Sequence, residues 1–306
     1  MNHTTTIERG PVLAAGLTAV MWGVTGIFVR LLPPVSPVSI TASRLVGALV
    51  VALPIFAISK AKRSHLKEAL KGPLGYALAS LLTGYYLAAT AAFQLAPVAE
   101  VALLLSTPPL FVLALRRIRG DVPATLELIG AGLAVVGIAL ILGPRLTLAE
   151  RLGNHRLVGD VLAICAAILT ALYIYIYRQV ARDRRALEPT SVTFMTFALG
   201  SVALIAVGCV LPTTITVTPF GGANLLIFLG LSILCTAIPS FAFAFASERL
   251  PSVVTATISL LIPLFAAAFA FVMLGERVPS TAIPGSVLVV AGIVRDCHDS
   301  SPRQPS

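Results

Sequence analysis

Charged side chains are scarce in this chain of 306 residues: they make up 11% of it, whereas hydrophobic residues make up 57%. An ordinary soluble domain has about a quarter of its residues charged, because polar side chains must cover its water-facing surface. The low charge therefore excludes a soluble globular fold. At about 20 residues per bilayer crossing, the length suffices for roughly ten membrane helices, which leaves no room for a catalytic domain outside the membrane.

Motifs for enzyme chemistry are also missing. The sequence has no HExxH, GxSxG or acidic metal-binding run, and its four histidines fall in predicted loops or tails. It has no GxxxxGK[ST] motif, which excludes ATP hydrolysis by this chain. The four cysteines show neither a CxxC pair nor metal-ligand spacing and are interpreted as small packing residues. We therefore predict no enzymatic activity, no catalytic residues, no cofactor and no metal site.

Apolar runs of about 20 residues follow one another along the chain. These runs do not alternate between polar and apolar residues, so in lipid their backbone groups can be hydrogen-bonded only within helices. The sequence predicts an all-α integral membrane protein with ten transmembrane helices, at residues 12–31, 37–59, 73–94, 97–115, 124–142, 158–177, 190–211, 224–246, 251–273 and 280–295.

The formal net charge of +9 follows the predicted topology. Sixteen of the 22 basic residues fall on one side of the ten spans and four on the other, while Arg30 and Arg44 lie inside spans. Because cytoplasmic loops are enriched in Lys and Arg, this split predicts that both termini are cytoplasmic. The positive charge thus indicates a lipid bilayer as partner and not a nucleic acid, and the short basic segment 60–71 is expected on the inner leaflet.

The two halves of the chain resemble each other. Residues 96–111 match residues 250–265 at a shift of 154, and after a slip of one residue Gly120-Asp121 matches Gly275-Glu276. This indicates two five-helix halves, 1–146 and 147–306. Because five is odd, the second half must enter the membrane from the opposite side, which makes the repeats inverted. Inverted repeats are typical of alternating-access transporters, with the site near the midplane between them.

The repeated block, together with WGVTGIFVR (22–30) and SRLVGALVV (43–51), resembles the drug/metabolite transporter superfamily, specifically its EamA-type ten-helix transporter family. In the second half the block reads LPSVVTATISLLIPLFAAAFAFVMLGERVPSTAIPG (250–285). The resemblance covers nearly the whole chain. It implies ten helices, cytoplasmic termini and export of small metabolites, amino acids among them.

Arg44 and Glu100 are the ionisable residues that the sequence places well inside predicted spans. A charge in hydrocarbon costs about 3 kcal/mol or more, so each is expected to face a cavity or a partner. Their similar depth makes a mutual ion pair the least costly arrangement. Such a pair either locks two helices together or forms a site, in which Arg44 binds a substrate carboxylate and Glu100 exchanges a proton.

Aromatic residues at mid-span are further candidates for substrate binding. Trp22, the only tryptophan, lies too deep for an interfacial anchor, and its indole N–H needs an acceptor. Tyr85, Tyr86 and Tyr173 lie at similar depth. Prolines in the fourth and ninth spans are hinge or gate candidates, since proline removes a backbone donor and bends a helix; the alternative is a harmless kink. These prolines are Pro108, Pro109 and Pro263.

Together these observations predict a secondary transporter in the cell (inner) membrane that exports small molecules such as amino acids or their derivatives. The alternatives are a non-transporting scaffold or receptor and, with less support, a membrane-embedded enzyme. The sequence specifies neither the substrate, nor the energy coupling, nor the oligomeric state.

Overall fold

The computed structural model describes residues 9–32, 35–120, 154–182, 187–210, 223–249 and 261–276, with isolated positions at 129–136 and 284–291. Helices joined by short turns make up these segments. In chain order they are α1 (Arg9–Gly23), α2 (Thr25–Leu31), α3 (Pro37–Ile58), α4 (Lys60–Ala69), α5 (Pro73–Leu95), α6 (Val98–Leu104), α7 (Pro108–Ile118), α10 (His155–Arg182), α11 (Pro189–Val210), α12 (Ala223–Ser232), the π-helical turn η2 (Ile233–Ala237), α13 (Ile238–Arg249) and α15 (Leu261–Leu274).

Six helical stretches in the described part of the chain are long and apolar enough to cross a membrane. They coincide with the first, second, third, sixth, seventh and eighth predicted spans, and α15 is a shorter apolar helix within the ninth. The fifth and tenth predicted spans and residues 251–260 of the ninth lie outside the described segments. The six stretches are Arg9–Leu31, Pro37–Ile58, Pro73–Leu95, His155–Tyr177, Pro189–Val210 and Asn224–Phe243.

Within the described segments, three of the predicted spans are not regular helices throughout. The first is interrupted at Val24, between α1 and α2, and the eighth contains η2, in which the Ile238 N–H donates to the Ile233 carbonyl five residues earlier. The fourth is divided into α6 and α7 because Pro108 has no N–H to continue the helix. At this break the Thr107 hydroxyl donates to the Leu104 carbonyl at 2.6 Å.

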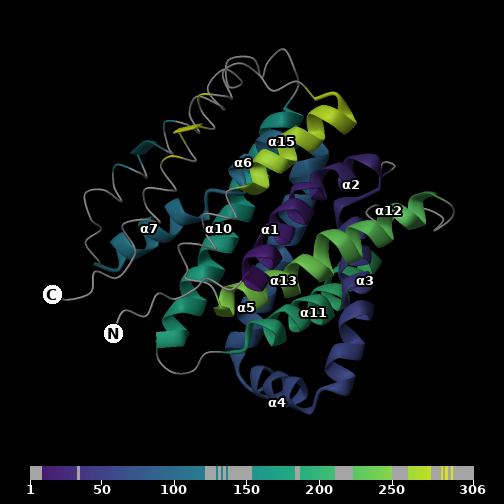
Figure 1. Ribbon diagram of the computed structural model, residues 1–306, viewed down its shortest axis with the longest axis vertical. Coiled ribbons are helices and arrows are strands. Elements are labelled where there is room, and N and C mark those ends of the chain that lie inside the picture. Colours follow the sequence, from purple (N-terminus) through teal and green to yellow (C-terminus); the bar gives the residue numbers. More distant parts are fainter. Residues whose placement is uncertain are drawn as a thin grey trace.

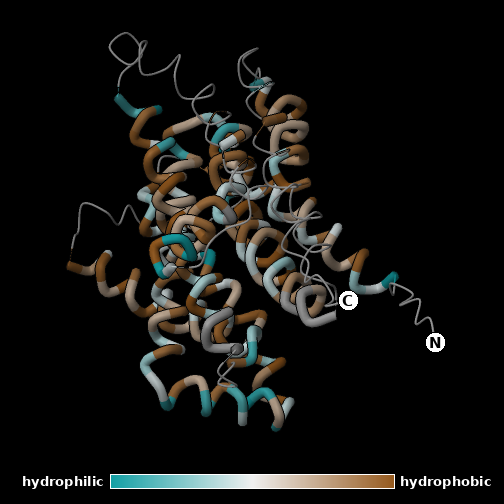
Figure 2. Tube along the Cα trace, turned by 90° about the vertical axis from the view of Figure 1, so that its left-hand side faces the viewer, coloured by the Kyte–Doolittle hydropathy of each residue, from teal (hydrophilic) through white to brown (hydrophobic). Residues whose placement is uncertain are grey.

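The helix α4 lies across one end of the bundle, which we call the α4 end (Figure 1). The chain turns sharply there because α3 ends at Ile58 and the Ser59 side chain caps the new helix by accepting the Lys62 N–H. One face of α4 packs on α3 and α11. Hydrophilic residues gather along it at the bottom of Figure 2, whereas the rest of the bundle is mostly apolar.

The main contacts between the described helices are reciprocal between the two halves of the predicted repeat. The repeat equates α1 with α2 to α10, α3 to α11, and α5 to α12–η2–α13. The helix α5 packs on α10, and α13 packs on α1; likewise α11 packs on α5 and α12 on α3, while α3 and α11 pack on each other. Reciprocal contacts of this kind are what a two-fold relation between the halves produces.

The ends of α7 and α15 provide a second sign of this relation. Among the described residues, the glycines with positive φ are Gly120 at +90° and Gly275 at +64°, the two positions that the repeat aligns. Each ends a helix in the left-handed conformation that glycine adopts without strain. After Gly275, the Glu276 N–H returns to the Ala270 carbonyl at 3.2 Å, which closes the helix end.

Candidate functional site

Arg44, on α3, is buried between α5 and η2 and only 2% exposed. Its Nε donates to the Thr236 hydroxyl at 3.0 Å, one terminal nitrogen to the Thr90 hydroxyl at 3.4 Å, and the other to the Cys235 carbonyl at 3.4 Å. The guanidinium carbon lies 4.8 Å from the centre of the Tyr86 ring. Arg44, Tyr86 and Thr90 come from the first predicted half and Cys235 and Thr236 from the second, so the cluster lies between the halves.

The local helix geometry explains why these groups converge. Tyr86 and Thr90 are four residues apart on α5 and therefore share a face. On the opposite side, η2 widens the helix by one residue, and π-helical turns of this kind occur frequently at functional sites. The Thr236 hydroxyl donates to the Leu231 carbonyl at 2.8 Å, which leaves its oxygen to accept from Arg44.

The expected ion pair between Arg44 and Glu100 does not form. Arg44 is bonded to hydroxyls, a carbonyl and a ring, all of them neutral, and within the described segments the ion pair joins Lys62 to Glu188 instead. Similar depth in the membrane did not predict the pairing correctly, because the two residues lie on helices with different main neighbours. The helix α3, which carries Arg44, packs mainly on α11, α12, η2 and α5, whereas α6, which carries Glu100, packs mainly on α15 and α10 and only slightly on α5 and α2.

The aromatic candidates divide into two groups. Tyr86 is buried and Tyr85 and Tyr173 are half-buried, and both of the latter interact electrostatically with Tyr86. Tyr86 lies against Arg44 and Tyr85 packs on Tyr86, with ring centres 5.3 Å apart, whereas Tyr173 stacks on Tyr177 at 5.8 Å. Trp22 is half-buried on α1 and packs on Phe243, with ring centres 5.2 Å apart.

Tyr86 also contacts the other half directly, through the Ser240 hydroxyl at 3.3 Å. Because Ser240 donates its own hydrogen to the Thr236 carbonyl at 2.6 Å, Tyr86 is the donor in this contact. The two residues differ by 154 in number, the shift of the repeat. The contact therefore joins the two predicted halves directly beside the Arg44 cluster.

Glu100 and Asp160 are buried acidic residues, 4% and 1% exposed. Sequence reasoning missed Asp160, because it lies only a few residues inside its predicted span and resembles a residue at a helix end. The hydroxyls of Thr90, Thr236 and Ser240 and the carbonyl of Cys235 were missed too. Pro239 was a signal for the Cys235 carbonyl, because a proline has no N–H to donate to the carbonyl four residues earlier.

The remaining candidate residues are the prolines proposed as hinges or gates, and Arg30 is considered with them. Pro108 and Pro109 begin α7 immediately after the break in the fourth span. Pro263 is buried in α15, and the residues before Leu261 lie outside the description. Arg30, which the sequence places inside the first span, is exposed and donates to the Ala96 carbonyl at 2.8 Å, at the C-terminal end of α5.

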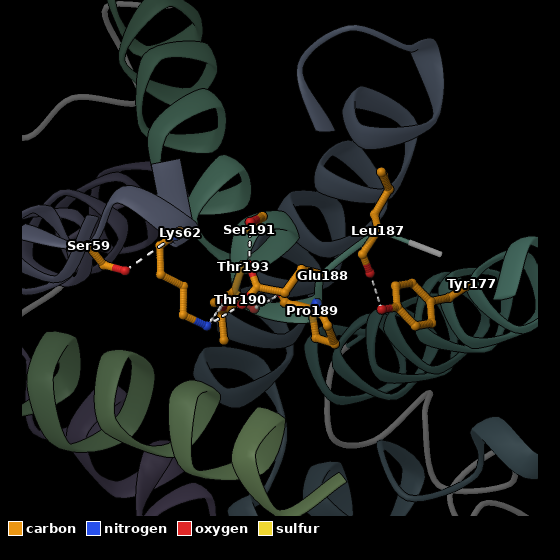
Figure 3. A network of polar contacts seen from close by, with 9 residues as sticks. All are labelled: Ser59, Lys62, Tyr177, Leu187, Glu188, Pro189, Thr190, Ser191 and Thr193. Atoms are coloured by element: carbon orange, nitrogen blue, oxygen red, sulfur yellow. Dashed lines mark hydrogen bonds and ion pairs between the residues drawn. The ribbon is translucent and has the colours of Figure 1, made fainter. Parts of the chain in front are cut away.

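A polar network joins the two halves at the α4 end (Figure 3). The Lys62 ammonium contacts the Glu188 carboxylate and lies 2.9 Å from the Thr190 hydroxyl. Ser191 donates to the same carboxylate at 2.6 Å. Burial alone would raise the pKa of Glu188, but the hydrogen bonds from Lys62, Ser191 and Thr190 outweigh it and hold the pKa below its ordinary value. The network therefore keeps Glu188 ionised and ties α4 to α11.

Comparison with known proteins agrees with this architecture. The model of the EamA-like transporter family matches residues 10–143 and again residues 157–295. The chain belongs to the EamA-like transporter family. Two proteins from Archaeoglobus fulgidus, each named "Uncharacterized transporter", share 26% and 28% identity with this EamA-family chain. The alignments cover 91% and 92% of this chain and 93% and 95% of the relatives.

A solved structure titled "Crystal structure of protein" has the same fold as this EamA-family chain. The TM-score is 0.66 at 21% identity, over 96% of this chain and 99% of that one. The family, the relatives and the apolar helices together identify a multi-pass membrane transporter, which is not an enzyme.

Proposed function

We propose that this EamA-family transporter exports small metabolites that carry a carboxylate, such as amino acids or their derivatives, across the cell (inner) membrane by alternating access. In this proposal two inverted five-helix halves, 1–146 and 147–306, form ten spans with both termini in the cytoplasm. The reciprocal packing of the halves supports the inverted arrangement. The 16-to-4 split of basic residues supports the orientation.

The observation that carries the substrate class is the neutral environment of Arg44. A guanidinium has five N–H donors, and three of them meet the neutral acceptors Thr90, Thr236 and Cys235. An opposite charge strongly stabilises a buried cation, and an Arg guanidinium binds a carboxylate through two parallel hydrogen bonds. A substrate carboxylate would supply that charge, with Trp22, Tyr85, Tyr86 and Tyr173 as candidates for its remaining contacts.

Uptake into proteoliposomes tests the substrate class. A screen of radiolabelled amino acids and derivatives identifies a substrate, and its decarboxylated amine is then measured beside it. Arg44→Lys replaces the planar guanidinium, which can form two parallel hydrogen bonds, by an ammonium that acts as a point charge. We therefore expect transport of the carboxylate substrate to fall by about tenfold or more. Transport that prefers the amine, or an Arg44→Lys protein as active as wild type, would contradict the proposal. Arg30→Lys is the matched control, since the exposed Arg30 on α2 binds the Ala96 carbonyl at the end of α5 and not the partners of Arg44.

Energy coupling is proposed to involve Glu100, the buried acid of α6. If its carboxylate exchanges a proton in each cycle, Glu100→Gln should abolish transport driven by a pH gradient but retain counterflow, which needs no net proton movement. Unchanged dependence on the gradient would show that coupling does not run through Glu100. Pro108, Pro109 and Pro263 are proposed as hinges or gates of the same cycle.

A further inference from the structure

The outer face of α4 carries a row of basic side chains. Lys60, Arg63 and Lys67 follow one another at spacings of three and four residues, which places them on a single face of the helix. All three are exposed, and with Ser64 they line one depression of the surface. We call these four residues the basic face.

The basic face is distinct from the network that joins the halves. The opposite face of α4 carries Lys62 and Leu66, which are half-buried, and Ala69, which is buried against α5 and α11. In the described part of the chain, Lys62 is the α4 cation that forms an ion pair, with Glu188. The charges of the basic face are therefore available to a partner outside the bundle.

The position of α4 indicates which partner that is. The helix lies where α3 ends and α5 begins, so it lies at the level at which two membrane spans leave the bilayer. Large apolar side chains are exposed on both sides of it: Ile58 is 84% exposed, Leu70 41% and Tyr76 43%. Tyrosine is enriched at headgroup depth, and exposed isoleucine and leucine there contact acyl chains. A basic face flanked by apolar side chains matches a lipid better than a water-soluble anion.

We propose that the basic face binds the phosphate of an anionic phospholipid headgroup from the leaflet at the α4 end. Lys60, Arg63 and Lys67 supply the positive charge, Ser64 supplies a hydroxyl donor, and Ile58 and Leu70 lie against the acyl chains. Because the other face of α4 holds Glu188 and Thr190 through Lys62, a lipid bound here also steadies the connection between the two halves.

Lipid retention by the full-length protein tests this proposal. The protein is purified in detergent, supplied with phosphatidylglycerol or phosphatidylcholine, and examined by native mass spectrometry and by its melting temperature. We expect phosphatidylglycerol to be retained and to raise the melting temperature more than phosphatidylcholine does. The triple variant Lys60→Gln, Arg63→Gln, Lys67→Gln should need about tenfold more phosphatidylglycerol for half-maximal binding, since each basic residue near an anionic surface contributes to the attraction. Higher salt should weaken wild-type binding in the same direction.

A control variant removes three charges elsewhere. Arg116, Arg117 and Arg119 lie at the end of α7, and their replacement by Gln should leave phosphatidylglycerol binding unchanged. Equal loss in both triple variants would show a general charge effect and overturn the proposal, as would unchanged retention in the α4 variant. Stabilisation by inorganic phosphate to the same extent would assign the face to a soluble anion instead. The single variant Arg63→Gln gives the same comparison with a smaller change, should the triple variant fold poorly.

Discussion

At the scale of the residue, several helix contacts depend on the absence of a side chain. Gly159, on α10, faces the end of α5, and a Cβ built there would lie 2.7 Å from the Ala96 Cβ and 2.9 Å from the Ala96 backbone nitrogen. The nitrogen is part of the backbone and the Cβ is bonded directly to it, so neither atom can move aside as the end of a flexible side chain could. Small residues at such points let helices approach closely in membranes, where packing is a main source of association.

Gly159→Ala should therefore destabilise the protein by about 1–3 kcal/mol, the usual cost of overpacking. Thermal unfolding in detergent measures the effect. Gly16→Ala on α1 is the matched control, because a Cβ there meets nothing within 4 Å. Alanine favours helix slightly over glycine, so Gly16→Ala should be neutral or slightly stabilising. Equal melting temperatures for the two variants would contradict the close contact between α5 and α10.

Arg44 shows how much of a single residue's role can be predicted from the sequence. Charge and depth identified it as important, because a cation amid apolar residues is rare. Its hydroxyl partners could not be found in the same way, since threonine has no distinctive sequence signal, whereas Pro239 indicates that the Cys235 carbonyl lacks a helical donor. Which way Arg44 points depends on the rotation of α3 and on the extra residue in η2, and neither is visible in the spacing of apolar residues.

At the scale of the element, α4 connects the two halves. Lys62 is 32% exposed and Glu188 16%, so their ion pair is only partly shielded from water. Thr190 and Ser191 complete the network from the first turn of α11. Partly exposed pairs of this kind contribute little unless hydrogen bonds hold them in place, as they do here.

A double-mutant cycle on Lys62→Gln and Glu188→Gln should give a coupling of about 1 kcal/mol near neutral pH. The pKa of Glu188 is lowered in the folded protein, so its stabilising contribution is complete above the ordinary carboxyl pKa of about 4.3. It is lost as the pH falls through the lower, folded pKa. The melting temperatures of wild type and Glu188→Gln should therefore converge in acid. A constant difference at all pH values would show that Glu188 does not titrate as the network requires.

Interruptions of helices were only partly predictable. Pro108 identified the break between α6 and α7, since the missing N–H is a property of one residue. Pro239 lies just after the π-helical turn at 233–237 and is a comparable signal there, whereas Val24 itself carries no such signal. The helix α4 was also only partly predictable: its basic residues were visible in the sequence, but the division into a face toward α11 and a face toward the outside required the fold.

At the scale of the whole molecule, the repeat was the most informative sequence feature. Its signal came from Pro, Gly and acidic residues at helix ends, which tolerate few substitutions for conformational reasons, and Gly120 and Gly275 share a positive φ accordingly. The repeat could not reveal that α5 packs on α10 and α13 on α1, because an alignment of two halves contains no information on their contact. The packing of α5 on α10 and of α13 on α1 forms two similar interfaces, as a rocking motion between the halves would require.

If the halves rock, the contact between Lys62 and Glu188 must open and close in each cycle, since it joins α4 of the first half to the start of α11 in the second. Cysteines introduced by Lys62→Cys and Glu188→Cys, in a background lacking the exposed Cys165 and Cys209 and the tail residue Cys297, can be linked by a short thiol-specific reagent. Linking should stop transport in proteoliposomes, and reduction of the link should restore it. The single variant Lys62→Cys, treated in the same way, should stay active. Full transport by the linked protein would mean that the α4 end stays closed throughout, and alternating access would then require a different moving part.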